Sequence, residues 1–308
     1  MISTSGPPFG VASEIPSRAD EVRLHSVLEG RACAVCGGPV HIRIAAWSAR
    51  CDTCRSWASN LPVGGPELDT HTRITGLEPL RRENFRVILS ELRSLRPLQD
   101  ARILDVGSAY GWFLEEAAAA GAVAVGIEPD ADIASHSTGD VRVGFFPDAI
   151  PASENFDIIA FNDVLEHLPD VPGAISICHE HLPTQGLLSI NIPTADGIAF
   201  RVACVLARVG IYGPYQRLWQ FGLPSPHLHY FSTKALVTLI EDRGFRVVKI
   251  RQLSSLKRQG LWQRVRMVDR PGPVHVLAFV GMYAAANLLD RPGLSDIVHI
   301  IAERTEAL

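Results

Sequence analysis

The chain has 308 residues, 47% hydrophobic and 20% charged, which is long and apolar enough to bury a full α/β core. Its formal net charge of −4 excludes a general electrostatic attraction to nucleic acid, so we expect no nucleic-acid partner. Four of the six cysteines form two CxxC units, which indicates metal binding in a reducing cytoplasm and excludes a disulfide scaffold.

Residues 1–30 are expected to form a flexible tail, because the opening stretch is rich in Ser, Pro and Gly and lacks the apolar core of a signal peptide. Residues 31–60 carry two cysteine pairs with fourteen residues between them: Cys33, Cys36, Cys51 and Cys54. This spacing is typical of a zinc ribbon, with four thiolates around a tetrahedral Zn²⁺. Because four sulfurs complete the coordination, we expect a structural metal that supplies folding energy. The ribbon could grip a substrate, a partner or RNA, or only stabilise a lid.

Residues 61–76 are punctuated by Pro and Gly, which predicts a linker to a second domain over residues 77–308. That domain opens with apolar residues at helical spacing, which predicts a helix over Leu77 to Leu95. Three arginines lie on the other side of this helix: Arg81, Arg82 and Arg86. We interpret them as a solvated face, with contact to a cofactor carboxylate as the alternative.

The segment from Ile103 to Glu128 has the pattern of a buried strand, a glycine loop, a helix and a second strand. Such a βαβ half-unit places a nucleoside against the carboxyl edge of a parallel sheet. Gly107 and Gly111 bracket the loop, and Asp105 stands two residues before the first glycine. A carboxylate there would repel a pyrophosphate but suits a cationic ligand, such as the ammonium and sulfonium of S-adenosylmethionine. Glu128, about twenty residues past Gly107, is placed to accept from a ribose hydroxyl.

Further motifs follow in the chain. Phe156 to Asn162 predicts a buried fourth strand, Asp163 to Leu168 reads D-V-L-E-H-L, and His227 to Ser232 precedes a late helix. With the glycine loop, these motifs resemble class I S-adenosylmethionine-dependent methyltransferases of the small-molecule type, over roughly residues 77–304. The resemblance implies an α/β fold with a Rossmann-like, seven-stranded sheet whose last strand is antiparallel, preceded here by the small zinc ribbon. Ala109 departs from the family's usual glycine, and its methyl group is tolerable if φ is negative.

The resemblance also implies how S-adenosylmethionine is held. Phe146 would pack on the adenine ring, Asp148 would accept from the exocyclic amine, and Asn162 would lie near the methionyl part. Phe145 and Phe146 could alternatively be two core residues. The complete cofactor-binding set that we predict is Asp105, Gly107, Ser108, Ala109, Tyr110, Gly111, Glu128, Pro129, Phe146, Asp148, Asn162 and Asp163.

The acceptor side is predicted from less regular sequence. Residues 196–226 form a long connection rich in aromatic residues, Gly and Pro, which is typical of a lid or acceptor-binding loop. Its candidate contact residues are Tyr212, Tyr215, Arg217, Trp219 and Phe221. His227 occupies the position of the family's histidine, and we predict that it is the base that deprotonates a hydroxyl acceptor. His229 and His167 are the other catalytic candidates.

Alternatives stay open for these residues. His227 could only fix its loop by hydrogen bonding, and His167 could shape its turn and line the acceptor pocket. Asp163, Glu166 and His167 could instead bind a divalent metal, which their chemistry suits only in part.

Residues 255–292 combine basic residues with an apolar run, Val274 to Leu289, that is too short and too interrupted for a membrane span. We expect a buried or dimer-forming helix here, and hence a homodimer. The alternative is a basic and apolar segment that rests on a membrane surface. It would make this cytoplasmic protein peripheral at the inner membrane and would fit a lipid-linked acceptor.

The predicted function is transfer of the methyl group of S-adenosylmethionine to a small or carrier-linked acceptor, in the first place a hydroxyl of a sugar or secondary metabolite. The alternatives are an RNA methyltransferase that uses the zinc ribbon for RNA recognition and a non-catalytic S-adenosylmethionine-binding protein. An NAD-dependent oxidoreductase ranks lower, because the loop lacks the third glycine and carries Asp105.

Overall fold

The computed structural model describes residues 28–62, 70–255 and 294–306, and nine single positions between 261 and 284. The predicted tail up to residue 27, the linker over 63–69 and most of the 255–292 insertion lie outside the described residues, so those expectations stay predictions.

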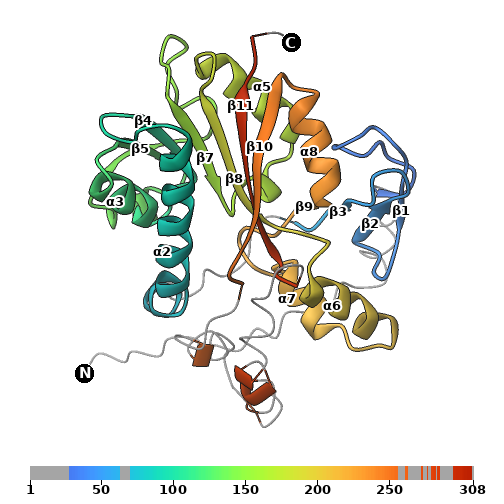
Figure 1. Cartoon of the computed structure of the whole chain (residues 1–308). Helices are drawn as coiled ribbons and strands as arrows, with labels where there is room; N and C mark the ends of the chain where they lie inside the picture. The colour runs from blue at the N-terminus through green and yellow to red at the C-terminus, as the bar shows by residue number, and fades with distance from the viewer. Residues whose placement is uncertain are drawn as a thin grey trace, which may run out of the picture.

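Seven strands form one mixed sheet in the order β10-β11-β8-β7-β4-β5-β6 (Figure 1). Their bounds are β4 Arg102–Val106, β5 Val123–Glu128, β6 Asp140–Val143, β7 Ile158–Asn162, β8 Leu187–Pro193, β10 Phe245–Leu253 and β11 Ile297–Arg304. Neighbours from β8 through β6 pair in parallel, whereas β11 is antiparallel to both β8 and β10. The predicted seven-stranded sheet with an antiparallel last strand is confirmed.

Helices cover both faces of this sheet (Figure 1). They are α2 Thr70–Leu95, α3 Trp112–Ala119, α4 Ala131–Ser135, the 3₁₀ turn η1 Leu165–His167, α5 Val171–His181 and α8 Thr233–Glu241. Ile103 and Ile158 pack in one apolar cluster with α2 and α3, whereas Leu104 and Ile159 pack in another with α5 and α8. Successive residues of a strand point to opposite faces, so the central strands are apolar on both sides.

A second, four-stranded sheet carries the cysteine pairs. Its strands β1 Val40–Ile42, β2 Ser48–Cys51 and β3 Trp57–Ser59 follow one another as antiparallel neighbours, and β9 His229–Tyr230 completes it. The β3–β9 pair sets Trp57 opposite Tyr230. A late segment of the methyltransferase-like domain is therefore an edge strand of the ribbon's sheet.

Aromatic side chains join this sheet to the predicted lid. The lid holds two helices, α6 Ile198–Arg208 and α7 Gly213–Leu218. Trp47 of the ribbon stacks on Tyr215 at a centroid distance of 5.4 Å and meets Trp219 edge-on at 5.8 Å. Tyr215 and Trp219, which we expected to contact the acceptor, are both 0% exposed. That expectation is wrong for these two residues, because they anchor α7 to the ribbon.

Of the helices that the structure describes, none combines the length and apolar character needed to cross a bilayer. The long helix α2 has 26 residues, but charged side chains recur along it.

The glycine loop between β4 and α3 adopts an unusual backbone. Gly107, Ala109 and Gly111 all have positive φ, at 70°, 45° and 77°. The expectation of a negative φ at Ala109 is therefore wrong. Its N–H donates to Glu128 at 3.0 Å, and this bond helps to hold the left-handed conformation, which is costly for a residue with a Cβ.

Ala109→Gly should relieve that cost. We expect the free energy of unfolding to rise by about 0.5 kcal/mol, because the relief exceeds the extra chain entropy of glycine. Ala118→Gly, at an exposed helical position of α3, is the matched control and should lower it by about 0.5–1 kcal/mol. Urea unfolding measures both. A loss of stability in both variants would contradict the strain at Ala109.

Candidate active site

The carboxyl ends of three parallel strands bring Asp105, Glu128 and Asn162 to one edge of the sheet. Asn162 donates from Nδ2 to Oδ1 of Asp105 at 2.9 Å. Glu128 accepts from the backbone N–H groups of Ala109 and Asp130, each at 3.0 Å. Glu128, at the end of β5, thus fixes the glycine loop. Asn162, at the end of β7, holds Asp105 of β4 through a hydrogen bond.

Burial has the largest effect on the ionisation of Asp105, because this residue is only 2% exposed. Loss of water raises the pKa of this carboxyl to about 7; the hydrogen bond from Asn162 opposes the rise and the negative charge of Glu128 adds to it. Near neutral pH the carboxyl is therefore divided between its protonated and ionised forms. A cationic ligand at this edge would favour the ionised form.

Other predicted cofactor residues lie around the same edge, where β6 ends. Phe146 is half-buried and Asp148 is exposed. Tyr110, in the glycine loop, is buried and its ring stacks on Trp112 at a centroid distance of 5.2 Å. Phe145 is 71% exposed, which rules out a core position for it.

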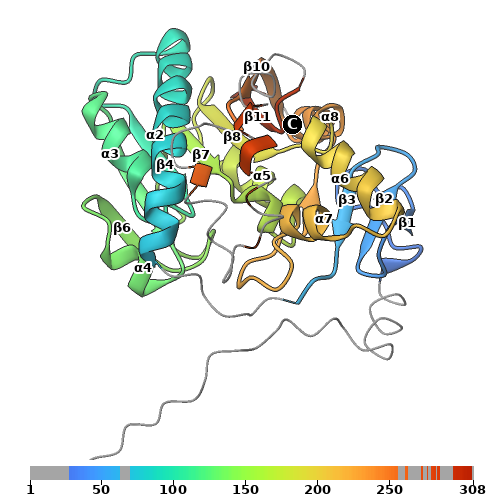
Figure 2. The same cartoon turned by 90° about the horizontal axis from the view of Figure 1, so that it is seen from below.

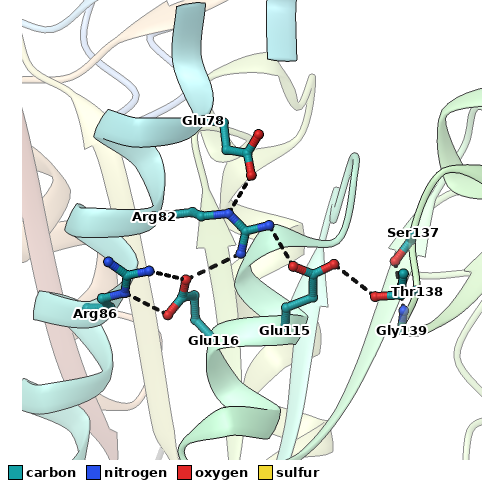
Figure 3. A network of polar contacts seen from close by, with 8 residues as sticks. All are labelled: Glu78, Arg82, Arg86, Glu115, Glu116, Ser137, Thr138 and Gly139. Atoms are coloured by element: carbon teal, nitrogen blue, oxygen red, sulfur yellow. Dashed lines mark hydrogen bonds and ion pairs between the residues drawn. The ribbon is translucent and has the colours of Figure 1, made fainter. Parts of the chain in front are cut away.

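The arginines of α2 form ion pairs. The interpretation as a solvated face is wrong for Arg81 and Arg82, which are partly buried, whereas the side chain of Arg86 is 64% exposed. Arg82 contacts Glu78 and Glu115, each at 2.6 Å, and Arg86 contacts Glu116 at 2.8 Å (Figure 3). Hydrogen bonds from Arg86 lower the pKa of Glu116, with burial opposing and Arg82 adding to the fall. These contacts tie α2 to α3, the helix that begins at the glycine loop.

Arg81 points to the active edge instead. Its guanidinium lies 3.1 Å from a carboxylate oxygen of Asp163, the first residue of the D-V-L-E-H-L motif. Asp163 has a φ of 55°, and its N–H donates to the carbonyl oxygen of Asn191 at 2.8 Å. Helix α2 is thus held to the end of β7 as well as to α3.

A buried polar cluster lies next to Asp163. Nε2 of His227 is 3.9 Å and Nε2 of His167 is 4.0 Å from the same carboxylate oxygen of Glu166. Glu166 is 0% exposed, and within the described part of the chain neither of its side-chain oxygens has a hydrogen-bond partner. Burial raises the pKa of Glu166 well above its usual value, and burial also lowers the pKa values of His227 and His167. At neutral pH both imidazoles are therefore unprotonated.

The third predicted catalytic histidine is engaged elsewhere. Nε2 of His229 lies 3.1 Å from the carbonyl oxygen of Leu168, and its ring stacks on Phe231 at 5.6 Å. His229 is also paired with Ala58 in the β3–β9 ladder. Its geometry is that of a residue that fixes the segment.

Two groups of side chains in the described residues could hold a metal ion. In the ribbon, the four sulfur atoms lie within 4.8 Å of one another, with Cys33 to Cys54 at 3.6 Å and Cys36 to Cys51 at 3.5 Å. A tetrahedron with Zn–S bonds of about 2.3 Å has edges of about 3.8 Å, so the cluster fits Zn²⁺. The second group is Glu166, His167 and His227. Here His227 replaces Asp163 of the set that we considered from the sequence.

Several residues that the sequence did not single out position His227. Ser59 of β3 donates from Oγ to the carbonyl oxygen of His227 at 2.6 Å. Gln220 Nε2 lies 2.8 Å from Nε2 of His227, and Ser56 Oγ accepts from the N–H of Ser232 at 3.1 Å. Ser59 and Ser56 stand 168 and 176 positions before their partners in the chain, so no local sequence pattern could have predicted these contacts.

Comparison with known proteins agrees with this geometry. A family model of a methyltransferase domain matches residues 80–250, more than half of the chain. The ubiquinone biosynthesis O-methyltransferase of Azorhizobium caulinodans is 31% identical over 125 residues, which cover 37% of this chain and 49% of that protein. The mitochondrial enzyme of the same name from Mus musculus is 26% identical over 199 residues, covering 60% and 52%. The chain thus spans about half the length of these curated relatives.

A solved structure supports the fold alone. The cyclopropane synthase MmaA2 of Mycobacterium tuberculosis aligns with a TM-score of 0.52 at 17% identity, over 75% of this chain and 86% of that one. The sheet order, the acid-and-glycine loop at its carboxyl edge and the family match over residues 80–250 lead to one conclusion. The chain belongs to the class I S-adenosylmethionine-dependent methyltransferases.

Proposed function

We propose that the chain methylates a hydroxyl group of a small or carrier-linked acceptor, such as a sugar or secondary metabolite. The observation that carries the proposal is the buried group that His227, just before β9, forms with Glu166 and His167 of the turn after β7. An oxygen nucleophile must lose its proton, and unprotonated imidazoles next to the methyl donor suit that task. The relatives named O-methyltransferases support the same reaction type.

In this proposal the cofactor lies across the carboxyl ends of β4, β5 and β6. Asp105 would bind its ammonium end, Glu128 its ribose hydroxyls, and Phe146 with Asp148 its adenine. The remaining predicted contacts come from the loop and strand ends: Gly107, Ser108, Ala109, Tyr110, Gly111, Pro129, Asn162 and Asp163. The ring of Tyr110 stacks on Trp112 of α3, and Asp163 is paired with Arg81. We therefore propose that Tyr110 also supports the glycine loop and that Asp163 also supports the strand edge.

The cofactor supplies a methyl group activated on a sulfonium. The chain's own residues align the acceptor and take its proton. As the acceptor oxygen took the methyl group and the cofactor left as its thioether, the hydroxyl proton would pass to a ring nitrogen of His227. Acceptance at Nε2 would require the amide nitrogen of Gln220, which lies 2.8 Å from it, to turn away. Gln220 and Ser59 hold the His227 residue in place, through its ring and its carbonyl group respectively. His167 and Glu166 line the same side.

Cofactor affinity should depend on pH through Asp105. Its pKa of about 7 means that the ionised carboxylate, which the ammonium group needs, is lost as the pH falls. We expect affinity to fall by about eightfold between pH 7.5 and pH 6, measured by calorimetry. Asp105→Asn should bind weakly at both values, without this slope. The exposed Asp132→Asn variant is the control. An unchanged slope in Asp105→Asn would contradict the assignment.

His227→Ala tests the reaction. The protein is incubated with methyl-labelled S-adenosylmethionine and host extract, and RNA, protein, lipid and small-molecule fractions are counted. We expect label in the small-molecule or lipid fraction, and a transfer rate about 10²–10⁴-fold lower in His227→Ala with cofactor affinity unchanged. His41→Ala, in the ribbon, is the control. Near-normal transfer by His227→Ala would sink its role as the base, and label in RNA would replace the proposed acceptor class.

We further propose that the four ribbon cysteines bind one structural Zn²⁺. Their sulfur spacing supports this, as do N–H groups of Val35 and Cys54 that point at the sulfurs of Cys33 and Cys51, each at 3.4 Å. The ribbon's strands have only three or four residues, so the metal would add to the folding energy that their packing supplies.

Metal analysis should find about one zinc per chain. Cys51→Ser should lose it and lower the thermal midpoint by several degrees, because one open coordination position weakens binding. Cys204→Ala, a cysteine outside the ribbon, should keep its zinc. Full zinc content in Cys51→Ser would argue against the four-thiolate site.

A further inference from the structure

Helix α6 exposes an apolar face, although it lies in a folded domain. Val202, Val205 and Val209 recur at helical spacing and are 49%, 57% and 70% exposed. The turn after the helix continues the surface with Ile211, 52% exposed, and Tyr212, 41% exposed. We call these five residues the α6 face. Five large apolar side chains exposed in succession mark a surface that meets a partner.

Two exposed cations flank the α6 face. Arg201 and Arg208, both exposed, are seven residues apart and form a row on the same helix beside the valines. The chain has no Asp or Glu from residue 197 to residue 240, whereas this stretch carries four cations: Arg201, Arg208, Arg217 and Lys234. The acids at the start of α6, Asp196 and Asp296, accept hydrogen bonds from the backbone N–H groups of Thr233 and Phe200. The stretch is therefore basic on a chain whose net charge is −4.

The α6 face lies at the acceptor end of the molecule. The α6–α7 unit leads directly into the acceptor side, since the carbonyl oxygen of Trp219 accepts from the N–H of His227 at 3.1 Å. Figures 1 and 2 show α6 at the same end as the short described pieces of the 255–292 insertion. Those pieces expose apolar side chains as well, namely Val276, Val280 and Tyr283.

Charge decides between two occupants of this face. A symmetric contact with a second copy would set the face against itself and bring Arg201 and Arg208 near their own equivalents, while the nearest acids, Asp196 and Asp296, already accept from backbone N–H groups. An anionic bilayer offers phosphates to the arginines and an acyl boundary to the valines. We propose that the α6 face docks the protein on an anionic membrane surface, with the acceptor side of the site toward the lipid. This goes beyond the proposed methyl transfer and does not require it.

The test is co-sedimentation of the full chain with phosphatidylcholine vesicles that contain or lack phosphatidylglycerol. We expect binding only with the anionic lipid, and a loss of binding at high salt. Val202→Glu combined with Val205→Glu should lower the partition coefficient by at least about tenfold. Arg201→Glu combined with Arg208→Glu should lower the partition coefficient by roughly fivefold or more for each cation that is replaced.

Matched controls change exposed residues elsewhere. Val123→Glu, at a residue 53% exposed at the start of β5, and Arg93→Glu, on α2, should bind vesicles as the unmodified protein does. Cofactor binding by every variant shows that it is folded. Three results would overturn the proposal: no binding to anionic vesicles at low salt, equal binding by the valine variant, or a dimer that the valine variant splits without any vesicle binding. Because no turnover is measured, failure here leaves the proposed reaction standing.

Discussion

The pairing of β3 with β9 is the constraint on which the position of the His227 segment depends. Ser59 of β3 makes two hydrogen bonds to the segment that carries His227. Its N–H donates to the carbonyl oxygen of Leu228 at 2.8 Å, and its Oγ donates to the carbonyl oxygen of His227. On the other side, the N–H of Leu228 donates to the carbonyl oxygen of Glu166 at 2.9 Å. The histidine segment is thus held between the ribbon and the turn after β7. These contacts make the ribbon part of the structure that positions His227.

The cofactor half depends on other interactions. The parallel register of β4, β5 and β7 brings Asp105, Glu128 and Asn162 to one edge. The ion pairs of Arg82 and Arg86 then fix α2 against α3 (Figure 3). No residue of the ribbon takes part in these contacts among the described residues. The two halves of the site can therefore be perturbed separately, which is useful for an enzyme that binds a common cofactor and a particular acceptor.

Sequence reasoning recovered what local pattern encodes. Apolar runs that end near Asp105, Glu128 and Asn162 predicted three buried strands and the edge of the site, because strand ends at a switch point line a crevice. It could not find the β3–β9 pair, since β9 has two residues and no periodicity. Nor could it foresee the positive φ of Ala109, which follows from a tertiary hydrogen bond to Glu128.

Burial was the other source of error. Aromatic residues in a loop rich in Gly and Pro indicate a binding surface, but Tyr215 and Trp219 meet tryptophans of the ribbon that lie far away in sequence. The same holds for Arg81, whose partner Asp163 comes from another strand end. Spacing predicts which face of a helix a residue occupies, whereas its partner depends on the packing of the whole domain.

Hydrogen exchange on the protein with zinc bound and after chelation would test this division most directly. We expect the amide of Ser232, which donates to Ser56 of the ribbon, to lose protection when the ribbon is released. The amides of Gly107 and Gly111, bonded to β5 and within the glycine loop, should keep theirs. Cofactor affinity should stay the same. Retained protection at Ser232, or an equal loss at the glycine loop, would contradict the claim that the ribbon helps to hold the His227 segment but not the glycine loop.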